Sequence, residues 1–225
     1  NESSLLTNLI GLSVYFLLFN ILLFLLYNDK NKKWNVIAII INTAFYYGLS
    51  VYPGFYFKQK GGGLLSASLA VFYLVFAYLA YNKKISHYFN TYIVLCFGFL
   101  TLAVPLQFNR EWVTISWAVL TLILVLLSFR LKEDVIRITS SVVGLITLIR
   151  LVFYDAWNLN PIDIANILES TRLFAFAATI IVAYIVAYLY YKNKEEFENY
   201  DRYIVYINAG YAIAVTALTT LIIWL

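Results

Sequence analysis

The sequence has very little charge and almost none of the residues that form metal and redox sites. Only 12% of its 225 residues are charged, against about 25% in soluble domains. It contains no methionine, one cysteine (Cys96) and one histidine (His87). A single cysteine excludes an intrachain disulfide, and these two residues cannot form a metal cluster. We therefore expect no metal and no cofactor.

Hydrophobic residues make up 63% of the chain, which is more than a soluble domain of this length can bury. This composition also excludes a disordered chain. The apolar runs are about twice as long as barrel strands and do not alternate, so they predict helices. We expect eight spans, at about 5–27, 34–52, 64–82, 88–106, 112–130, 135–154, 171–191 and 203–225.

The fold class predicted is therefore all-α, a polytopic transmembrane helical bundle of about eight spans, with residues 1–225 as a single transmembrane domain. The chain opens on Asn1 and stops at Leu225, inside an apolar run. We expect a fragment of a longer membrane protein; a cleaved signal peptide is the alternative for the front end.

Basic residues are distributed unequally between the two sides of the predicted bundle. Eleven of the sixteen lie in or beside the odd-numbered loops, and five lie in or beside the even-numbered ones. The positive-inside rule then places the odd loops in the cytoplasm and both ends of this chain outside. Four tryptophans fall near predicted interfaces, where an aromatic belt is expected: Trp34, Trp112, Trp157 and Trp224.

Two stretches of the chain are similar to each other. Residues 78–94 and 188–205 both end one span with tyrosines and lysines and open the next with a tyrosine. Because four spans separate them, they indicate parallel four-helix repeats, 1–107 and 108–225, around an axis along the membrane normal. Coincidence is the alternative, since tyrosine, leucine and lysine are abundant here.

Charged groups at membrane depth are costly and are therefore candidates for function. Three arginines and three carboxylates fall near the predicted outer ends of spans four to seven. Arginine's planar fork suits carboxylate or phosphate recognition, so the cluster is a candidate ligand-binding site; ion pairs that only join helices are the alternative. The six residues are Arg110, Glu111, Arg150, Asp155, Glu169 and Arg172.

Other polar features have structural interpretations. Asn20, Asn42 and Asn208 lie within spans, where we expect polar helix–helix contacts. Asn160-Pro161 predicts a helix start. Residues 161–170 are then either an interfacial amphipathic stretch or an early start of span seven. The run Gly61-Gly62-Gly63 predicts a flexible outer turn.

The segment from Ala103 to Ala118 resembles a known family element. Pro105-Leu106 followed by Trp112-Val113-Thr114-Ile115-Ser116-Trp117-Ala118 is similar to the Pro-Leu…Trp-x-Thr-x-x-Trp-Ala element of a large bacterial family of predicted multi-spanning membrane proteins of unknown function. Residues 148–155 and 170–173 resemble that family's arginine-bearing elements, but residues 119–121 depart from its pattern. The resemblance adds no biochemical activity, because the family has no agreed one. We expect a bacterial cytoplasmic (inner) membrane and assign no catalytic residue.

Three hypotheses for function follow, with a non-enzymatic role favoured. The first is a transport or flipping module for an amphipathic, anionic envelope component, such as a lipid-linked glycan. The second is a structural or assembly subunit of a membrane complex, and the third is a membrane-embedded transferase. The expected partners are the lipid bilayer, a lipid or lipid-linked ligand and membrane proteins; we expect no nucleic acid.

Overall fold

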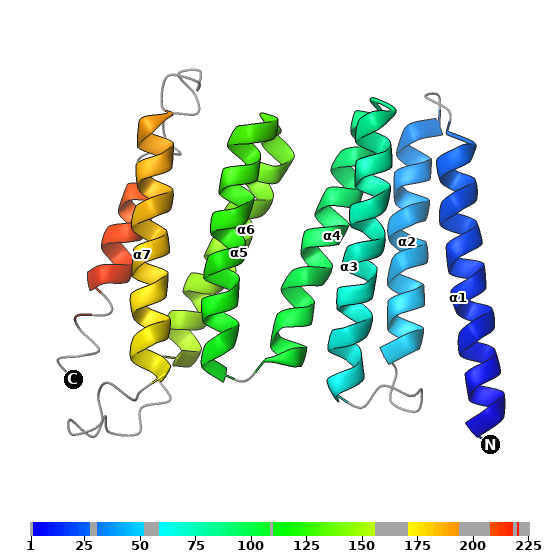
Figure 1. Ribbon diagram of the computed structural model, residues 1–225, viewed down its shortest axis with the longest axis horizontal. Coiled ribbons are helices and arrows are strands. Elements are labelled where there is room, and N and C mark those ends of the chain that lie inside the picture. Colours follow the sequence, from blue (N-terminus) through cyan, green and yellow to red (C-terminus); the bar gives the residue numbers. More distant parts are fainter. Residues whose placement is uncertain are drawn as a thin grey trace. The chain divides into compact units, whose positions relative to one another are not determined.

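In a computed structural model, the chain is a series of long helices joined mainly by short connections (Figure 1). The structure describes residues 2–27, 31–51, 59–108, 110–155, 171–193, 208–217 and 220. These residues form helices and turns and contain no strand, so the all-α polytopic class is confirmed. The chain divides into two compact units, Asn1–Gln107 and Phe108–Leu225.

Within the described residues, six helices are long and apolar enough to cross a membrane. Such helices satisfy their own backbone hydrogen bonds, as the bilayer interior requires. Unit 1 contains α1 (Glu2–Leu25), α2 (Lys32–Val51), α3 (Gln59–Asn82) and α4 (Ser86–Gln107). Unit 2 contains α5 (Arg110–Leu131), α6 (Asp134–Arg150), the π-helical turn η2 (Leu151–Asp155), α7 (Thr171–Lys192) and helical residues 208–217.

The unit boundary coincides with the boundary between the two candidate repeats. A repeat relation between the units stays a prediction. The stretch at 161–170 and both ends of the predicted span at 203–225 lie outside the described residues.

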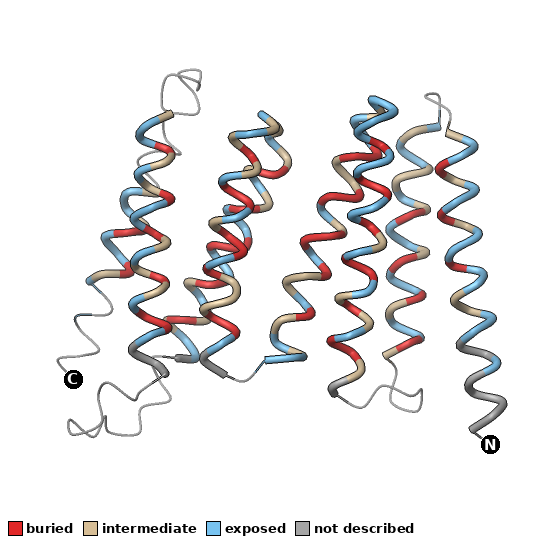
Figure 2. Tube along the Cα trace, in the orientation of Figure 1, coloured by how far each residue is buried: buried red, intermediate tan, exposed pale blue. Residues whose placement is uncertain are grey.

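Aromatic side chains fill the interior of unit 1. Phe16 and Phe24 of α1 meet Tyr73 and Phe76 of α3, and Tyr92 of α4 stacks on Tyr73 with ring centroids 5.8 Å apart. Figure 2 shows buried residues alternating with exposed ones along the helices. Many of the exposed residues have large apolar side chains. Exposed apolar faces are those expected to contact lipid.

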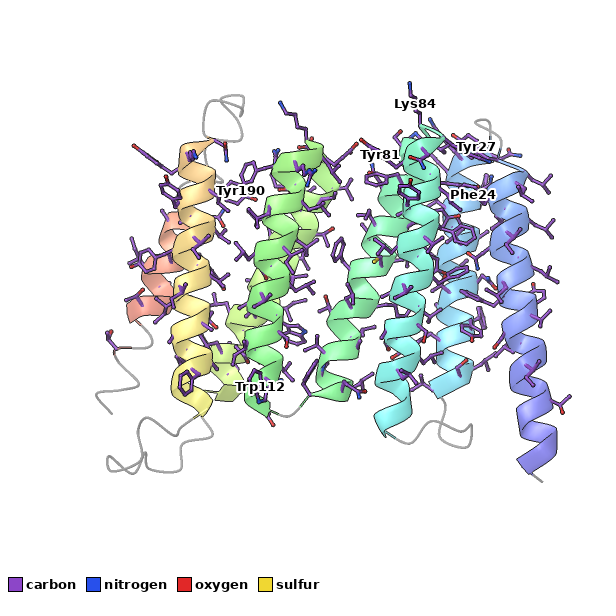
Figure 3. The ribbon with its side chains drawn as sticks, in the orientation of Figure 1. Phe24, Tyr27, Tyr81, Lys84, Trp112 and Tyr190 are labelled. Atoms are coloured by element: carbon purple, nitrogen blue, oxygen red, sulfur yellow. The ribbon has the colours of Figure 1, made fainter. Side chains whose placement is uncertain are left out.

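The connection between α3 and α4 is a tight turn. Lys84 has a φ of 57°, and its N–H donates to the carbonyl of Tyr81 while Ile85 N–H donates to the carbonyl of Ala80. This is the pattern of a Schellman cap, which satisfies the last carbonyls of the helix. Figure 3 shows Lys84 pointing away from the helices.

The glycine run does not form the flexible turn that the sequence predicts. Gly61, Gly62 and Gly63 lie inside α3. A Cβ on Gly63 would stand 2.7 Å from Oε1 and 3.3 Å from the backbone nitrogen of Gln107 on α4. The glycines therefore allow α3 and α4 to approach closely, and this packing overrides their weak helix propensity.

Helices of unit 2 pack around α5, which contacts both α6 and α7. Val125 packs with Val186 and Tyr190 in one core cluster, and Leu151 packs with Phe176 in a second. Small residues such as Ala118, Gly144 and Ala183 line the cavity that is described next.

Candidate functional site

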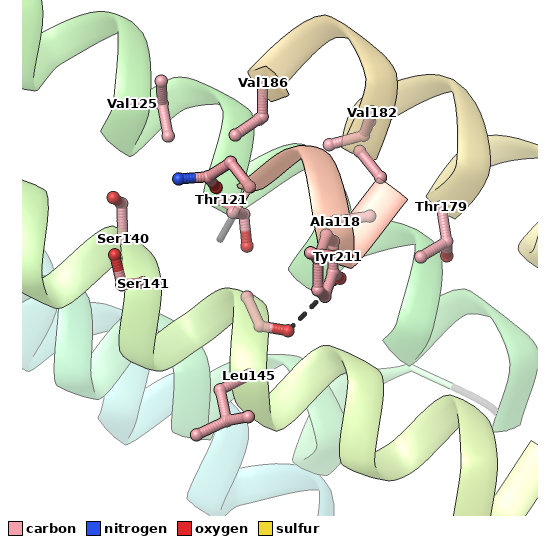
Figure 4. Close-up of a pocket in the computed structure, with 13 residues that line it drawn as sticks. Ala118, Thr121, Val125, Ser140, Ser141, Leu145, Thr179, Val182, Val186 and Tyr211 are labelled. Carbon is pink, nitrogen blue, oxygen red and sulfur yellow. Dashed lines mark hydrogen bonds between the residues drawn. The ribbon is translucent and has the colours of Figure 1, made fainter. Parts of the chain in front are cut away.

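A cavity of about 310 Å³ lies inside unit 2, between α5, α6, α7 and helical residues 208–217 (Figure 4). Ligand pockets have volumes of about 300–1,000 Å³. Its walls are mainly apolar and include Val125, Val182 and Val186. Six polar side chains also line it: Thr121, Ser140, Ser141, Thr179, Asn208 and Tyr211.

The cavity lies near the middle of the spans. Thr121 is at the centre of the 22-residue helix α5, and Thr179 is eight residues into the 22-residue helix α7. A molecule inside would therefore be at the depth of the hydrocarbon interior when these helices span a bilayer.

Small residues leave this space open. Gly144 of α6 lies against Thr121, whose methyl carbon Cγ2 would be 3.3 Å from a Cβ on the glycine. Ala118 and Ala183 contribute only methyl groups to the walls. A close helix contact at Gly144 thus adjoins a region that no large side chain fills.

Hydroxyl groups around the cavity donate hydrogen bonds to backbone carbonyls. Thr121 donates to the Trp117 carbonyl at 2.9 Å, and Thr179 donates to the Ala175 carbonyl at 2.8 Å. Tyr211 donates to the Gly144 carbonyl at 3.3 Å, the dashed line in Figure 4. With the donors engaged, the hydroxyl oxygens retain lone pairs that can accept a hydrogen bond from a ligand.

The cavity reaches the surface of unit 2 beside α6. Ser141 is exposed, and Leu145, one turn further along, is 55% exposed. The cavity is therefore open at the side of α6.

Arg150 ends α6 and is held by three neighbours. Its Nε donates to the Thr114 hydroxyl at 3.1 Å. Its guanidinium carbon lies 5.7 Å from the ring centroid of Trp117 and 4.7 Å from that of Tyr154. Tyr154 belongs to η2, a π-helical turn of a kind often found at functional sites. The cation is thus positioned by two aromatic faces.

A second arginine lies near the other end of α6. The Arg137 side chain is 15% exposed, and its Nη1 lies 3.1 Å from Asp134 Oδ1. Its position near the start of a span does not by itself predict this low exposure. Arg137 and Arg150 are thirteen residues apart, a separation of about 20 Å along a helix, and α6 lines the cavity between them.

The six predicted ligand-binding residues are described to different extents. Arg110 and Glu111 begin α5, Asp155 ends η2 and Arg172 lies in the first turn of α7. Their side chains and all of Glu169 lie outside the described residues. Arg150 is described, and it does not line the cavity. A shared site for the six residues stays a prediction.

The three predicted amides differ in their surroundings. Asn20 is fully buried, and its Nδ2 donates to the Phe16 carbonyl at 2.9 Å, inside α1. Asn42 Nδ2 is buried without a hydrogen-bond partner among the described residues. Asn208 lines the cavity of unit 2. Asn208 is therefore the one of the six polar lining residues that the sequence analysis singles out.

Comparison with known proteins identifies a family over almost the whole chain. Residues 11–225 match the family described as "Predicted membrane protein (DUF2339)". Among curated proteins and solved structures, none matches this chain significantly.

Proposed function

We propose a function for this chain as an integral membrane protein that belongs to the DUF2339 family of predicted membrane proteins. In this proposal, unit 2 binds and moves an amphipathic anionic molecule. The cell envelope of a bacterium is the proposed setting, with the chain in the cytoplasmic membrane. Both ends lie outside in this proposal, because the basic residues favour cytoplasmic odd loops.

The cavity of unit 2 supports this proposal. An apolar cavity at mid-span depth accepts a hydrocarbon chain, and its hydroxyl groups accept hydrogen bonds from polar parts of the molecule. Arg137 and Arg150 place a cation near each end of the same helix. An anionic headgroup would find a guanidinium on either side of the apolar region.

The test is transbilayer movement of a fluorescent anionic lipid in liposomes that contain the purified protein. Ser141→Phe places a ring at the exposed edge of the cavity and is expected to slow movement about tenfold by excluding the ligand. Val142→Phe is the matched control, because Val142 is an exposed neighbour on α6 that does not line the cavity. Equal rates for the two variants would refute a role for this cavity.

Arg150→Gln tests the proposed headgroup contact. It removes the charge but keeps a polar, shorter side chain, so the protein should fold while movement of anionic lipid falls about tenfold. Movement of a zwitterionic lipid is the internal control. If both lipids slow equally, Arg150 does not select the charge of the cargo.

An assembly subunit is the second candidate, and the interior of unit 1 favours it. The rings of Phe16, Phe24, Tyr73 and Tyr92 pack against one another, as expected of a rigid platform for partners. Stable copurification of another membrane protein would support this role. The transferase hypothesis requires an acid or base among Glu111, Asp155 and Glu169, and it stays a prediction.

A further inference from the structure

A groove of about 460 Å³ lies in unit 1, at the end where α2 and α4 both begin. Lys32 and Lys33 line it from the first turn of α2. His87, Asn90 and Thr91 line it from the first two turns of α4. The groove is thus built from two sequence-distant helices of the same unit.

The groove has positive character. Each helix N-terminus carries a partial positive charge and free N–H groups, and two lysine ammonium groups are added here. Unit 1 contains seven lysines and no arginine, against two acidic residues, Glu2 and Asp29; Asp29 lies outside the described residues. An anion is the ligand that this groove would attract.

Hydrogen-bonding groups in the groove fit a headgroup that carries hydroxyls beside its charge. Asn90 Oδ1 is buried and has no hydrogen-bond partner among the described residues. The Thr91 hydroxyl donates to the His87 carbonyl at 2.8 Å, so its oxygen can still accept. The imidazole ring of His87 also offers an N–H donor.

The floor of the groove is apolar and continues along α2. Val36 and Ile37 line it one turn beyond the lysines, and Ile37 is 44% exposed. A ligand with its charge at the lysines could therefore lay a hydrocarbon chain along α2. Basic pockets between helices at the membrane surface bind lipid phosphate groups by this combination.

We propose that this groove binds the phosphate-bearing headgroup of an anionic membrane lipid. This site is separate from the cavity of unit 2 and does not depend on the function proposed for that cavity. Phosphate is the shared chemistry, and a free phosphate ion is the second source that the test must distinguish.

The test measures binding of short-chain phosphatidylglycerol to the full chain in zwitterionic nanodiscs, with phosphatidylcholine as the uncharged comparison. The double variant Lys32→Gln/Lys33→Gln should weaken phosphatidylglycerol binding by at least about tenfold, because each lysine near an anionic lipid adds to the free energy of binding. Lys33 is exposed and Lys32 half-buried, so the fold should persist, and a thermal melt checks this.

Lys83→Gln/Lys84→Gln is the matched control, since it removes two charges from the connection directly before α4 without altering the groove lining. This control variant should weaken phosphatidylglycerol binding by less than about twofold. An equal loss in both double variants, or equal binding of phosphatidylcholine, would overturn the proposal. Competition by millimolar inorganic phosphate would assign the groove to a free phosphate ion, and its failure to compete would assign it to the lipid.

Discussion

The two units fill their interiors in different ways. In unit 1, large rings from α1, α2, α3 and α4 contact one another, and tyrosine hydroxyls bond across helices, as Tyr88 does to the Leu23 carbonyl at 2.9 Å. In unit 2, small residues and hydroxyls surround a cavity at mid-span depth. Of the ring pairs between described residues, one, Phe129 with Tyr190, lies in unit 2.

This difference shows how residue size divides structural and functional roles. Lipid is as apolar as a protein interior, so membrane helices associate through packing and hydrogen bonds and gain little from the hydrophobic effect. Rings such as Tyr73 provide many contacts, whereas Gly144 and Ala183 leave some contacts unmade. We infer that unit 1 contributes more to stability and unit 2 retains space for a ligand.

The largest expected effect compares a buried ring with a residue of the cavity wall. Tyr73→Ala should cost about 4 kcal/mol of unfolding free energy, since it removes a fully buried ring. Thr179→Ala should cost under about 1 kcal/mol, because its hydroxyl bonds only inside α7. Reversible unfolding in mixed micelles measures both values.

Tyr73→Phe is the control for this comparison. It keeps the ring and removes the hydroxyl that bonds Thr43 of α2, so about 1 kcal/mol is expected. If Thr179→Ala destabilised the protein as much as Tyr73→Ala, the proposed division between the units would be wrong.

An intermediate effect on the free energy of unfolding is expected from Gly144→Ala and Gly63→Ala. In a helix, alanine is up to about 1 kcal/mol more stabilising than glycine. At Gly144 this gain should dominate, because the neighbouring Thr121 can shift into the cavity. At Gly63 the Cβ would press on the backbone of Gln107, and destabilisation of about 1 kcal/mol is expected.

Gly48→Ala supplies the reference for the glycine pair, since nothing lies within 4 Å of its would-be Cβ. The same unfolding assay reports all three variants. A loss of stability at Gly144 equal to that at Gly63 would mean that the cavity wall is as rigid as the α3–α4 contact.

The smallest effect concerns a feature that both units share. Lys84 follows α3 with a φ of 57°, and Lys132 follows α5 with a φ of 54°. Glycine adopts this conformation without steric cost, so Lys84→Gly and Lys132→Gly should each stabilise the protein by about 0.5 kcal/mol. Thermal unfolding of the two single variants tests it, and a decrease in either would indicate that the lysine side chain makes a stabilising contact.

Much of the fold could be predicted because span length and composition are local properties. The expected spans at 34–52 and 88–106 agree within two residues with α2 and α4. The prediction of a turn at residues 61–63 was wrong, because these glycines lie in a helix that packs closely against Gln107. No local pattern reveals such a contact.

The candidate site was less predictable, since it depends on which side chains face one another. Arg150 could be predicted as a candidate functional residue, because it is a charged residue among apolar neighbours. Its contacts with Thr114 and Trp117 could not, because both of those residues belong to α5. The low exposure of the Arg137 side chain could not be predicted for the same reason. The cavity beside Gly144 likewise depends on side chains from other helices, such as Thr121 of α5.

By itself, the sequence determined that this chain is a helical membrane protein, because the bilayer requires long apolar helices that satisfy their own backbone. It also determined where those helices run, since charge is confined mainly to the connections. Only the tertiary structure decided which interior is packed and which is open. That outcome depends on the sizes of side chains that meet from different helices, as rings do in unit 1 and as glycine, alanine and serine do in unit 2.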